Sequence, residues 1–402
     1  MPRLKKLEIK GFRSLKDVVW EPGNLNVVIG ENGSGKSNLL SALKLLQESA
    51  NKRLRDSVLA QGGLRRILWD HRASEIEFWI NFEVEAGGPG LPPWGLQYQL
   101  AVIPFGFGAG YSIDHETVTY HSAGNPVLLL ESDPFRCEIK AWNGDNMVDM
   151  SGPDGVQRVD PVYEGETAFS LYGTVEPRFV KLLRLFLNLR VYQDLTTHGA
   201  SRLREAAVAR VEQRLDSDGQ NLAPLLHTLY EESRDFKRTV NGAMIAAFGS
   251  EFEELSFPPA ADQKIQLAVR WKSLKDPISA ASLSDGTLRF LMLVAALANP
   301  EPVPLIAIDE PEAGLHPRML PIIAELAAAA SEKSTVIFTT HSPQFLDAFP
   351  EECVPTTTVA ELTDGATRLT RLDGDDLKRW LKDYSISLGQ MLVSGELEAL
   401  AP

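Results

Sequence analysis

Both ends of the chain carry the hydrophobic pattern of a buried parallel sheet. Three short apolar runs show no alternation: LNVVIG (25–30), PLIAIDE (304–310) and STVIFTT (334–340). Unbroken apolar runs of this length are typical of strands that are covered on both faces. Helical spacing of apolar residues follows the first run at about 36–50 and precedes the second at 288–299. Strands that alternate with helices in this way predict an α/β fold.

The middle of the chain follows two other patterns. In EIEFWINFEVE (75–85) every second residue from Ile76 to Val84 is apolar, and LQYQLAV (96–102) repeats the alternation. This alternation predicts an antiparallel meander with one buried face. Residues 178–250 have helical spacing instead, and 201–215 is predicted as one helix, with one face formed by Leu203, Ala207, Val211 and Leu215. No heptad pattern persists for the three or four repeats that a coiled coil needs.

These patterns divide the chain into three expected parts. We expect a discontinuous core formed by 1–50 and 270–402, because the buried strands lie there. An antiparallel β-rich subdomain is expected over 51–175, and a helical insert lobe over 176–269.

Composition and charge limit the partners and the cellular location that can be expected for the protein. The 402 residues are 44% hydrophobic and carry a net charge of −14, which argues against general binding of polyanions and leaves only a local basic patch for nucleic acid. No apolar run approaches the roughly 18 residues of a membrane span. The first residues, MPRLKKLEIKGF, lack the apolar core of a secretory signal, and the two cysteines form no CxxC pair. We therefore expect a cytoplasmic protein without a membrane partner.

The segment GENGSGKS follows a predicted strand, opens a predicted helix and fits the phosphate-loop pattern GxxxxGK[ST]. Its glycines let backbone N–H groups face phosphate oxygens. The alternative is a glycine-rich turn from strand to helix that binds no phosphate. Lys36 can reach the β- and γ-phosphates of ATP, and the Ser37 hydroxyl can hold Mg²⁺. The expected nucleotide-binding residues are Gly30, Asn32, Gly33, Ser34, Gly35, Lys36 and Ser37.

Two other strand ends carry candidate catalytic residues. Asp309 and Glu310 end a buried strand, where Asp309 can hold Mg²⁺ and Glu310 can orient and deprotonate an attacking water. His341 follows the strand in 334–340, so it reaches the edge where an open parallel sheet places its ligand. We interpret His341 as a γ-phosphate contact, and His316 as a residue that caps or orients a loop.

The order of these motifs resembles that of the ABC-type ATPases. A phosphate loop is followed by LSDGT (283–287), DEPEAGLHP (309–317) and THSP (340–343). The opening LEIKGFRSLKD (7–17) and the loop GENGSGKSNLL are similar to those of the SMC and RecF-like branch, and of a bacterial subgroup of compact, soluble predicted ATPases. The resemblance implies an ABC-type ATPase head that requires ATP and Mg²⁺.

The resemblance also implies a composite site. In this family the signature stretch binds the γ-phosphate of ATP held by the opposite subunit, so Ser284, Asp285 and Gly286 would complete the partner's site in a homodimer formed on ATP binding. The stretch departs from LSGGQ at Asp285 and Thr287, and a carboxylate beside a phosphate is unfavourable unless it points away. Ser284 is also placed to cap the following helix.

Two further residues are assigned from the resemblance. Gln61 is a candidate metal-contacting glutamine after the first helix. Arg13 would approach the nucleotide or pair with an acid.

The resemblance predicts an ATPase of DNA repair or maintenance, or of anti-phage defence. Any nuclease or effector would be separately encoded, because the segment after His341 is short for a Toprim domain. DNA contact is considered at Arg202, Arg204, Arg210 and Arg214, with a solvated helix face as the alternative because Glu205 and Glu212 interrupt them. A nucleotide-gated scaffold or clamp is the second hypothesis. A transport ATPase subunit is the third, and GFRSL and LSDGT argue against it.

Overall fold

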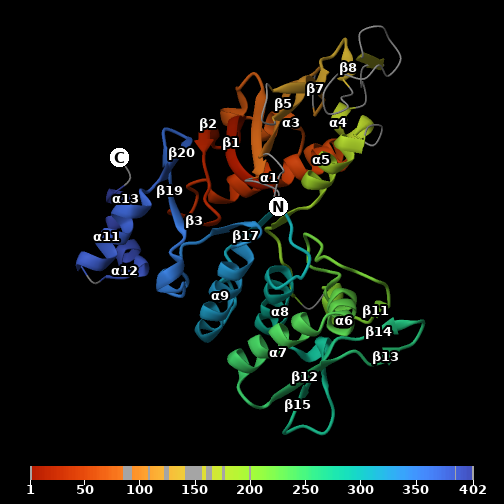
Figure 1. Ribbon diagram of the computed structural model, residues 1–402, viewed down its shortest axis with the longest axis vertical. Coiled ribbons are helices and arrows are strands. Elements are labelled where there is room, and N and C mark those ends of the chain that lie inside the picture. The colour runs from red at the N-terminus through yellow and green to blue at the C-terminus, as the bar shows by residue number, and fades with distance from the viewer. Residues whose placement is uncertain are drawn as a thin grey trace.

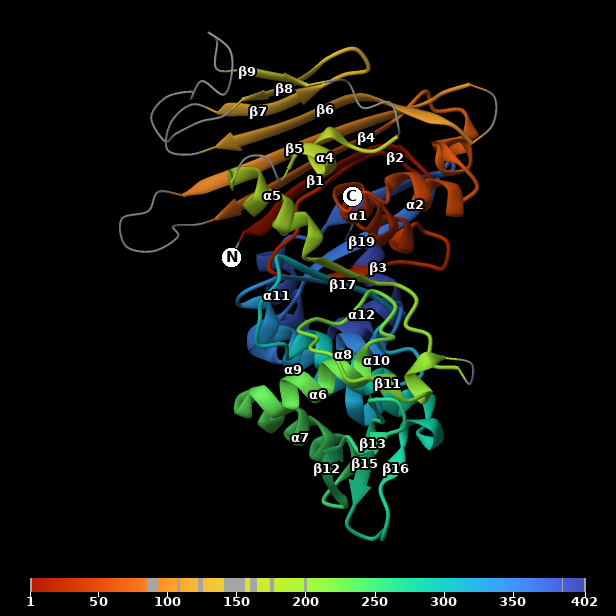
Figure 2. The ribbon, with the colours of Figure 1, turned by 90° about the vertical axis from the view of Figure 1, so that its right-hand side faces the viewer.

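The computed structural model describes residues 2–84, 93–106, 109–121, 126–140, 156–159, 165–173, 177–198, 201–384 and 386–400. Its elements form layers that Figure 2 shows in profile: an antiparallel sheet, a helical layer with α1 and α5, a mostly parallel sheet, and a lobe of helices and short strands. The expected boundary between 175 and 176 lies outside the described residues.

The central sheet contains the three apolar runs. Its strand order is β10-β17-β18-β3-β19-β20, in which β20 alone runs antiparallel to its neighbour. Every residue of β3 and β18 is buried, because helices cover one face and the α1 layer covers the other. The strands are β10 (Leu189–Tyr192), β17 (Leu305–Asp309), β18 (Thr335–Thr339), β3 (Leu25–Ile29), β19 (Thr356–Thr363) and β20 (Ala366–Arg371).

The antiparallel sheet begins earlier in the chain than expected. Its order is β2-β1-β4-β5-β6-β7-β8-β9. Residues 3–20, which were expected in the core, form its first two strands instead: β1 pairs with β4, and β2 pairs with β1. The predicted alternation is confirmed in β4, in which every second residue from Ile76 to Val84 is buried. The strands are β1 (Arg3–Phe12), β2 (Leu15–Trp20), β4 (Ile76–Val84), β5 (Trp94–Pro104), β6 (Tyr111–His121), β7 (Val127–Ser132), β8 (Cys137–Lys140) and β9 (Val156–Val159).

Helix α1 fills the space between the two sheets. Leu39, Leu43 and Leu46 are fully buried in one apolar cluster with Phe78 of the antiparallel sheet and Ile337 of the central sheet. This burial follows from the helical spacing of apolar residues after the phosphate loop. The helices of this layer are α1 (Lys36–Ala50), α2 (Leu54–Ala60), α3 (Leu64–Ile67), α4 (Ala168–Tyr172) and α5 (Pro177–Leu187).

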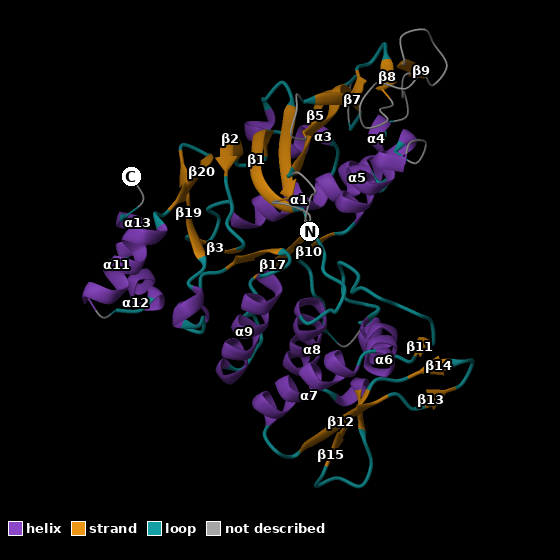
Figure 3. Ribbon diagram, viewed as in Figure 1, coloured by secondary structure: helices purple, strands orange, loops and turns teal. Residues whose placement is uncertain are grey.

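The remaining helices lie on the other side of the central sheet, as Figure 1 shows for α8 and α9. Short strands are mixed with the helices of the lobe (Figure 3). The helices are α6 (Leu222–Glu232), α7 (Arg234–Phe248), α8 (Asp285–Leu297), α9 (Leu320–Ser331), α10 (Pro343–Leu346), α11 (Gly374–Tyr384), α12 (Leu388–Ser394) and α13 (Glu396–Ala399). The strands are β11 (Ala207–Val208), β12 (Phe252–Ser256), β13 (Pro259–Ala260), β14 (Lys264–Ile265), β15 (Ala268–Trp271) and β16 (Ile278–Ser279).

The helix predicted over 201–215 is wrong. The segment forms a 3₁₀ turn at Arg202–Arg204 and the short strand β11, and then runs without regular structure. Tertiary hydrogen bonds replace the helical ones: Thr228 accepts from the Glu212 N–H at 3.1 Å, and Asn221 donates to the Arg214 carbonyl at 2.9 Å. Val211, which a helix would have buried, is 74% exposed.

A buried carboxylate joins the antiparallel sheet to the α1 layer. Glu116 of β6 accepts hydrogen bonds from the Tyr98 hydroxyl at 2.8 Å and from the N–H groups of Ala168 and Phe169 at 2.6 and 3.2 Å. Thr167, which caps α4, donates to the carbonyl of Ser49 in α1 at 2.9 Å. Burial raises the pKa of Glu116 to about 7, although these hydrogen bonds oppose the shift.

The raised pKa predicts a pH dependence of stability. The folded state retains the Glu116 proton between pH values of about 4.5 and 7 while the unfolded state loses it. The unfolding free energy therefore falls as pH rises through this window, by up to about 3 kcal/mol for this group. Urea unfolding at several pH values should show a smaller fall in Glu116→Gln. The exposed control Glu83→Gln should keep the wild-type slope, and equal slopes in all three proteins would contradict the prediction.

Candidate functional site

The site forms where three parallel strands end together. In the register of the central sheet, Asp309 of β17 lies opposite Thr339 of β18, and Thr339 lies opposite Val28 of β3. The loop after β3 is the predicted phosphate loop. The carboxyl ends of these strands therefore place Lys36, the two acids and the segment that ends in His341 at one edge of the sheet.

The phosphate loop has the backbone that its pattern predicts. Gly30, Gly33 and Gly35 have φ values of 145°, 84° and 101°, which favour glycine. Lys36 is buried, and its ammonium donates to the carbonyls of Gly30 at 2.6 Å and Glu31 at 2.8 Å. Burial lowers the pKa of Lys36, while Glu310, Asp309 and Glu312 oppose this shift. The ammonium thus lies inside the loop, where phosphate oxygens would be held.

Residues from both ends of the chain support this loop from outside. A Cβ atom on Gly35 would lie 2.0 Å from the Thr367 hydroxyl oxygen, so glycine is required by close approach as well as by φ. Thr367 donates to the Ser34 carbonyl at 2.8 Å and lies 2.7 Å from the Ser14 hydroxyl. Sequence analysis missed Ser14 and Thr367, because only the pairing of β20 with the sheet brings Thr367 to the loop.

Oxygen ligands of the kind that Mg²⁺ prefers converge beside Lys36. The Ser37 hydroxyl lies 3.3 Å from Oδ1 of Asp309, and the Thr339 hydroxyl donates to the same oxygen. A hydroxyl and a carboxylate this close suit two positions around one Mg²⁺ ion. The donor set therefore fits the metal that the sequence predicts.

Glu310 has an unusual backbone and faces the predicted histidine. Its φ is 45°, in the left-handed region that a residue with a side chain rarely adopts. Arg289 of α8 donates to its carbonyl at 2.8 Å, and Oε1 of Glu310 lies 3.1 Å from Nδ1 of His341. The Glu310 and His341 side chains are 41% and 52% exposed, so both can reach a molecule held at the phosphate loop.

Glu312 is an acid of the site that sequence analysis did not select. Thr340 donates to its Oε1 at 2.5 Å, while Oε2 is buried without a partner. Burial raises the pKa of this carboxyl. Its place two residues after Glu310 in DEPE was the only signal in the sequence.

A cleft of about 1180 Å³ runs along α1 and is lined by Ser37, Asp309, Gln61 and Gln193, among others. The carbonyl oxygen of Gln61 accepts a hydrogen bond from Arg13 at 2.7 Å. Gln193 follows β10, and its amide donates to the Ser37 carbonyl at 2.9 Å and to Ser41 at 3.1 Å. Of the two glutamines, Gln193 makes the direct contact with the end of the phosphate loop. It was missed because β10 has only four residues.

Arg13 is held by neutral side chains. Its guanidinium donates to Asn38 at 3.1 Å and to Ser41 at 3.2 Å, in addition to Gln61. Among these contacts there is no acidic partner, which was one of the two roles expected for Arg13.

Ser284 caps α8, as its position in the sequence predicts. Its hydroxyl accepts from the Thr287 N–H at 3.2 Å and lies 2.8 Å from the Thr287 hydroxyl. A Cβ atom on Gly286 would lie 2.6 Å from the Gly314 carbonyl oxygen, so this glycine allows the start of α8 to contact the loop after Glu310. Ser284 and Asp285 are exposed. Ser284, Asp285 and Gly286 are outside the set of described residues that line the cleft.

Arg204 is the partner of Asp285. Its NH2 group lies 2.7 Å from Oδ1 of Asp285, and this hydrogen bond lowers the pKa of Asp285. The carboxylate that sequence analysis found unfavourable beside a phosphate is therefore paired with a cation.

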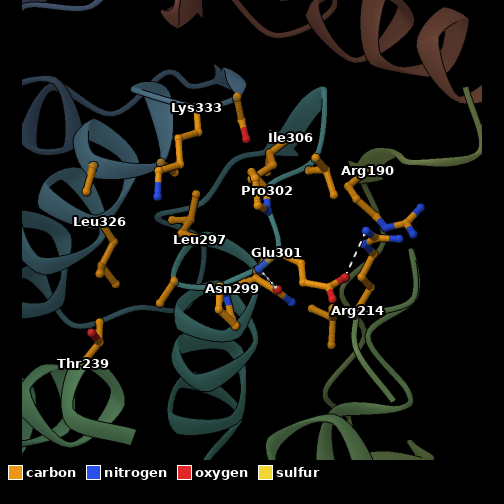
Figure 4. A pocket seen from close by; sticks show the side chains of 18 of the residues that line it. Arg190, Arg214, Thr239, Leu297, Asn299, Glu301, Pro302, Ile306, Leu326 and Lys333 are labelled. Carbon is orange, nitrogen blue, oxygen red and sulfur yellow. Dashed lines mark hydrogen bonds and ion pairs between the residues drawn. The ribbon is translucent and has the colours of Figure 1, made fainter. Parts of the chain in front are cut away.

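The other arginines considered for DNA contact are also engaged, except for the exposed Arg202. Arg210 pairs with Glu212 at 2.5 Å. Arg214 pairs with Glu301 at 3.2 Å beside Arg190, at a separate cavity of about 250 Å³ (Figure 4). Because 201–215 is not a helix, these arginines form neither a basic helical face nor the solvated helix face that was the alternative.

His316 caps a short turn. Its Nδ1 accepts from the Arg318 N–H at 3.2 Å, at the start of the 3₁₀ turn Pro317–Met319. The structure thus gives His316 the capping role that was expected of it.

Two parts of the chain are similar to known domain families. Residues 204–347 match the family described as "AAA domain, putative AbiEii toxin, Type IV TA system", and residues 3–86 match the family described as "AAA ATPase domain". The OLD nuclease of Thermus scotoductus is 22% identical over 93% of this chain. The DNA replication and repair protein RecF of Teredinibacter turnerae is 43% identical over 11% of this chain. The chain spans 63% of the length of that OLD nuclease and 12% of that RecF protein.

Solved structures establish the fold. The SmcHead bound to the C-winged helix domain of ScpA superposes with a TM-score of 0.53 at 15% identity, over 94% of this chain and 100% of that chain. The Smc head domain of Pyrococcus furiosus, bound to the C-terminal domain of ScpA, gives 0.53 at 14% identity, over 96% of this chain and 100% of that chain. The predicted ABC-type head fold and the resemblance to SMC and RecF-like ATPases are confirmed. Among the described residues, no helix has the length and apolar character needed to cross a membrane.

The two glutamines give a test of the site. Gln193→Ala should lower Mg²⁺-dependent ATP turnover at least about tenfold, because it removes a side chain that contacts the end of the phosphate loop. Gln61→Ala, the matched control in the same cleft, should change turnover less, since its oxygen is engaged by Arg13. Steady-state phosphate release over a Mg²⁺ titration provides the measurement. The reverse order of effects would support Gln61, the residue predicted from the sequence, as the metal-contacting glutamine.

Proposed function

We propose that this chain is a Mg²⁺-dependent ATPase that closes into a homodimer when it binds ATP. The observation that carries the proposal is the cluster of Ser37, Asp309 and Glu310 at the buried Lys36. These residues come from the ends of β3 and β17, the parallel strands on either side of β18, and are linked by the Ser37–Asp309 contact of 3.3 Å. A structural glycine turn alone would not require two acids and a histidine at the same edge.

The residues present fit ATP with its metal. Backbone N–H groups of residues 30–37 and the ammonium of Lys36 would hold the β- and γ-phosphates. Ser37 and Asp309 would hold Mg²⁺, and the side-chain oxygen of Gln193 would be a further ligand. When bound, Mg²⁺ neutralises charge that develops on the phosphate oxygens.

Glu310 is the proposed general base. Its carboxylate is exposed enough to reach a water beside the γ-phosphate, and the 3.1 Å contact with His341 orients it. The carbonyl of Glu310 is fixed by Arg289, which holds the strained backbone in place. His341 would contact the γ-phosphate in the transition state.

The signature at the start of α8 is proposed to serve the opposite copy. Its exposed N-terminal turn offers free N–H groups to an anion. Because Ser284 and Gly286 are outside the described lining of this copy's own cleft, the γ-phosphate they would contact is that of a second copy. ATP would then join the two copies at two equivalent sites.

The biological role we propose is a DNA-related one in the cytoplasm. This inference is supported by the similarity to one protein named as a nuclease and to another named for DNA replication and repair. A separately encoded nuclease or effector would supply the activity on DNA. ATP-dependent closure would regulate that partner.

Glu310→Gln tests the proposed base. The variant should bind ATP with nearly unchanged affinity and lose turnover by at least about a hundredfold, because an amide cannot accept the proton of the water. Nucleotide recovered from the protein after gel filtration should be ATP in Glu310→Gln and mainly ADP in the wild type. No nucleotide should be recovered from Lys36→Ala, because this variant should not bind ATP. Wild-type turnover in Glu310→Gln would exclude Glu310 as the base.

A mixture of two inactive variants tests the composite site. Ser284→Arg should keep ATP affinity in the monomer but lose turnover, because a long cation blocks the turn that receives the partner's phosphate. Lys36→Ala should lose ATP binding. In a mixed dimer one site has an intact phosphate loop and an intact signature, so the mixture should regain activity that neither variant has alone. Full turnover of Ser284→Arg by itself would show that this stretch only caps α8.

A further inference from the structure

We infer that Arg204 is a positioning residue for the signature: it holds the loop before α8 in place and cancels the charge of Asp285 so that a phosphate can approach. The inference rests on the proposed function, in which this turn receives the γ-phosphate of a second copy. It assigns to Arg204 a role that its position in the sequence, far from the signature, did not indicate.

One guanidinium makes most of the contacts that fix this loop. NH1 of Arg204 donates to the Leu283 carbonyl at 2.6 Å and lies 3.2 and 3.3 Å from the carbonyls of Ala280 and Ala281. Nε donates to the Thr197 carbonyl at 3.1 Å, and NH2 donates to Asp285 at 2.7 Å. Arg204 therefore connects the segment after β10 with the residues that lead into α8.

These contacts require an arginine. The planar guanidinium presents donors in a fixed fork and remains charged at all physiological pH values. A lysine at this position could pair with Asp285 but could not also reach Thr197 and three carbonyls of residues 280–283 from one plane. Arg204 is only 15% exposed, so its geometry is set by packing, unlike an ion pair between two mobile surface side chains.

The ion pair between Arg204 and Asp285 removes an unfavourable charge from the start of α8. The Asp285 side chain is 57% exposed and stands at the first residue of α8, beside the N–H groups that would bind a phosphate. A bare carboxylate there would repel the γ-phosphate of the opposite copy. With Arg204 at 2.7 Å the pair has no net charge, and the helix N-terminus can attract the anion.

This pairing explains the departure from LSGGQ. Where the common pattern has glycine, this chain has an aspartate, and the charge it introduces is matched by an arginine about 80 residues earlier in the sequence. Removal of Arg204 should therefore be more harmful than removal of both charged partners.

The experiment compares Arg204→Ala, Asp285→Asn and the double variant with the wild type. ATP-dependent dimerisation is measured by sedimentation with a non-hydrolysable ATP analogue and Mg²⁺, and the affinity of the monomer for ATP is measured separately. Arg204→Ala should weaken dimerisation roughly tenfold or more, with monomer affinity nearly unchanged, because a partly buried charge-assisted network is lost next to an exposed carboxylate. The double variant should recover at least about threefold of this loss. Arg210→Ala, whose arginine pairs with Glu212 on the same segment, is the matched control and should behave as the wild type.

The rescue separates charge cancellation from loop support. If Arg204 only held the loop, replacement of Asp285 would not restore dimerisation in its absence, and that result would overturn the charge-cancelling role. Wild-type dimerisation in Arg204→Ala would overturn the inference as a whole. If Arg204→Ala does not fold, Asp285→Asn alone decides: it should dimerise at least as well as the wild type, and weaker dimerisation would contradict the inference. A wild-type protein that never dimerises with the ATP analogue would instead contradict the proposed function itself.

Discussion

The parallel register of β3, β17 and β18 is the constraint on which the rest of the structure depends. It sets Asp309 opposite Thr339 and brings the phosphate loop to the same edge. Residues separated by 272 positions in the sequence, Ser37 and Asp309, thereby share a hydrogen bond. The strands hold this register because they are buried on both faces, by α1 on one side and by α8 and α9 on the other. A slip in register would separate the acids from Lys36.

Two arginines connect this edge with the signature. Arg289 lies in α8, five residues after its cap Ser284, and donates to the Glu310 carbonyl at 2.8 Å. Arg204 binds the loop just before α8. The start of α8 is thus fixed from both sides, and its contact with Gly314 leaves no room for a side chain at Gly286. Movement of α8 would therefore displace the backbone of Glu310. The Ser284 turn and the base of the same copy are mechanically linked, although we assign them to different composite sites.

The parts of the structure that could be predicted are those that depend on local sequence patterns. The phosphate loop, the acids at the end of β17 and the alternation in β4 each depend on neighbours within a few residues. Where long-range contacts decide the conformation, the local pattern in the sequence is absent or misleading. Residues 201–215 have helical spacing, but hydrogen bonds to Thr228 and Asn221 hold them in another conformation. Gln193 follows a four-residue strand that is defined only by its pairing at the edge of the central sheet. Residues 3–20 join the antiparallel sheet because β1 pairs with β4 and β2 pairs with β1. The partner of Asp285 is found only in three dimensions.

The central claim is that ATP joins two copies of this chain across shared sites. The most direct measurement is the mass of the wild-type protein in solution by light scattering, at one protein concentration, with Mg²⁺ and either ADP or a non-hydrolysable ATP analogue. The account predicts the monomer mass of 44.3 kDa with ADP and twice that mass with the analogue. A mass of 44.3 kDa in both conditions, with the analogue shown to be bound, would contradict it.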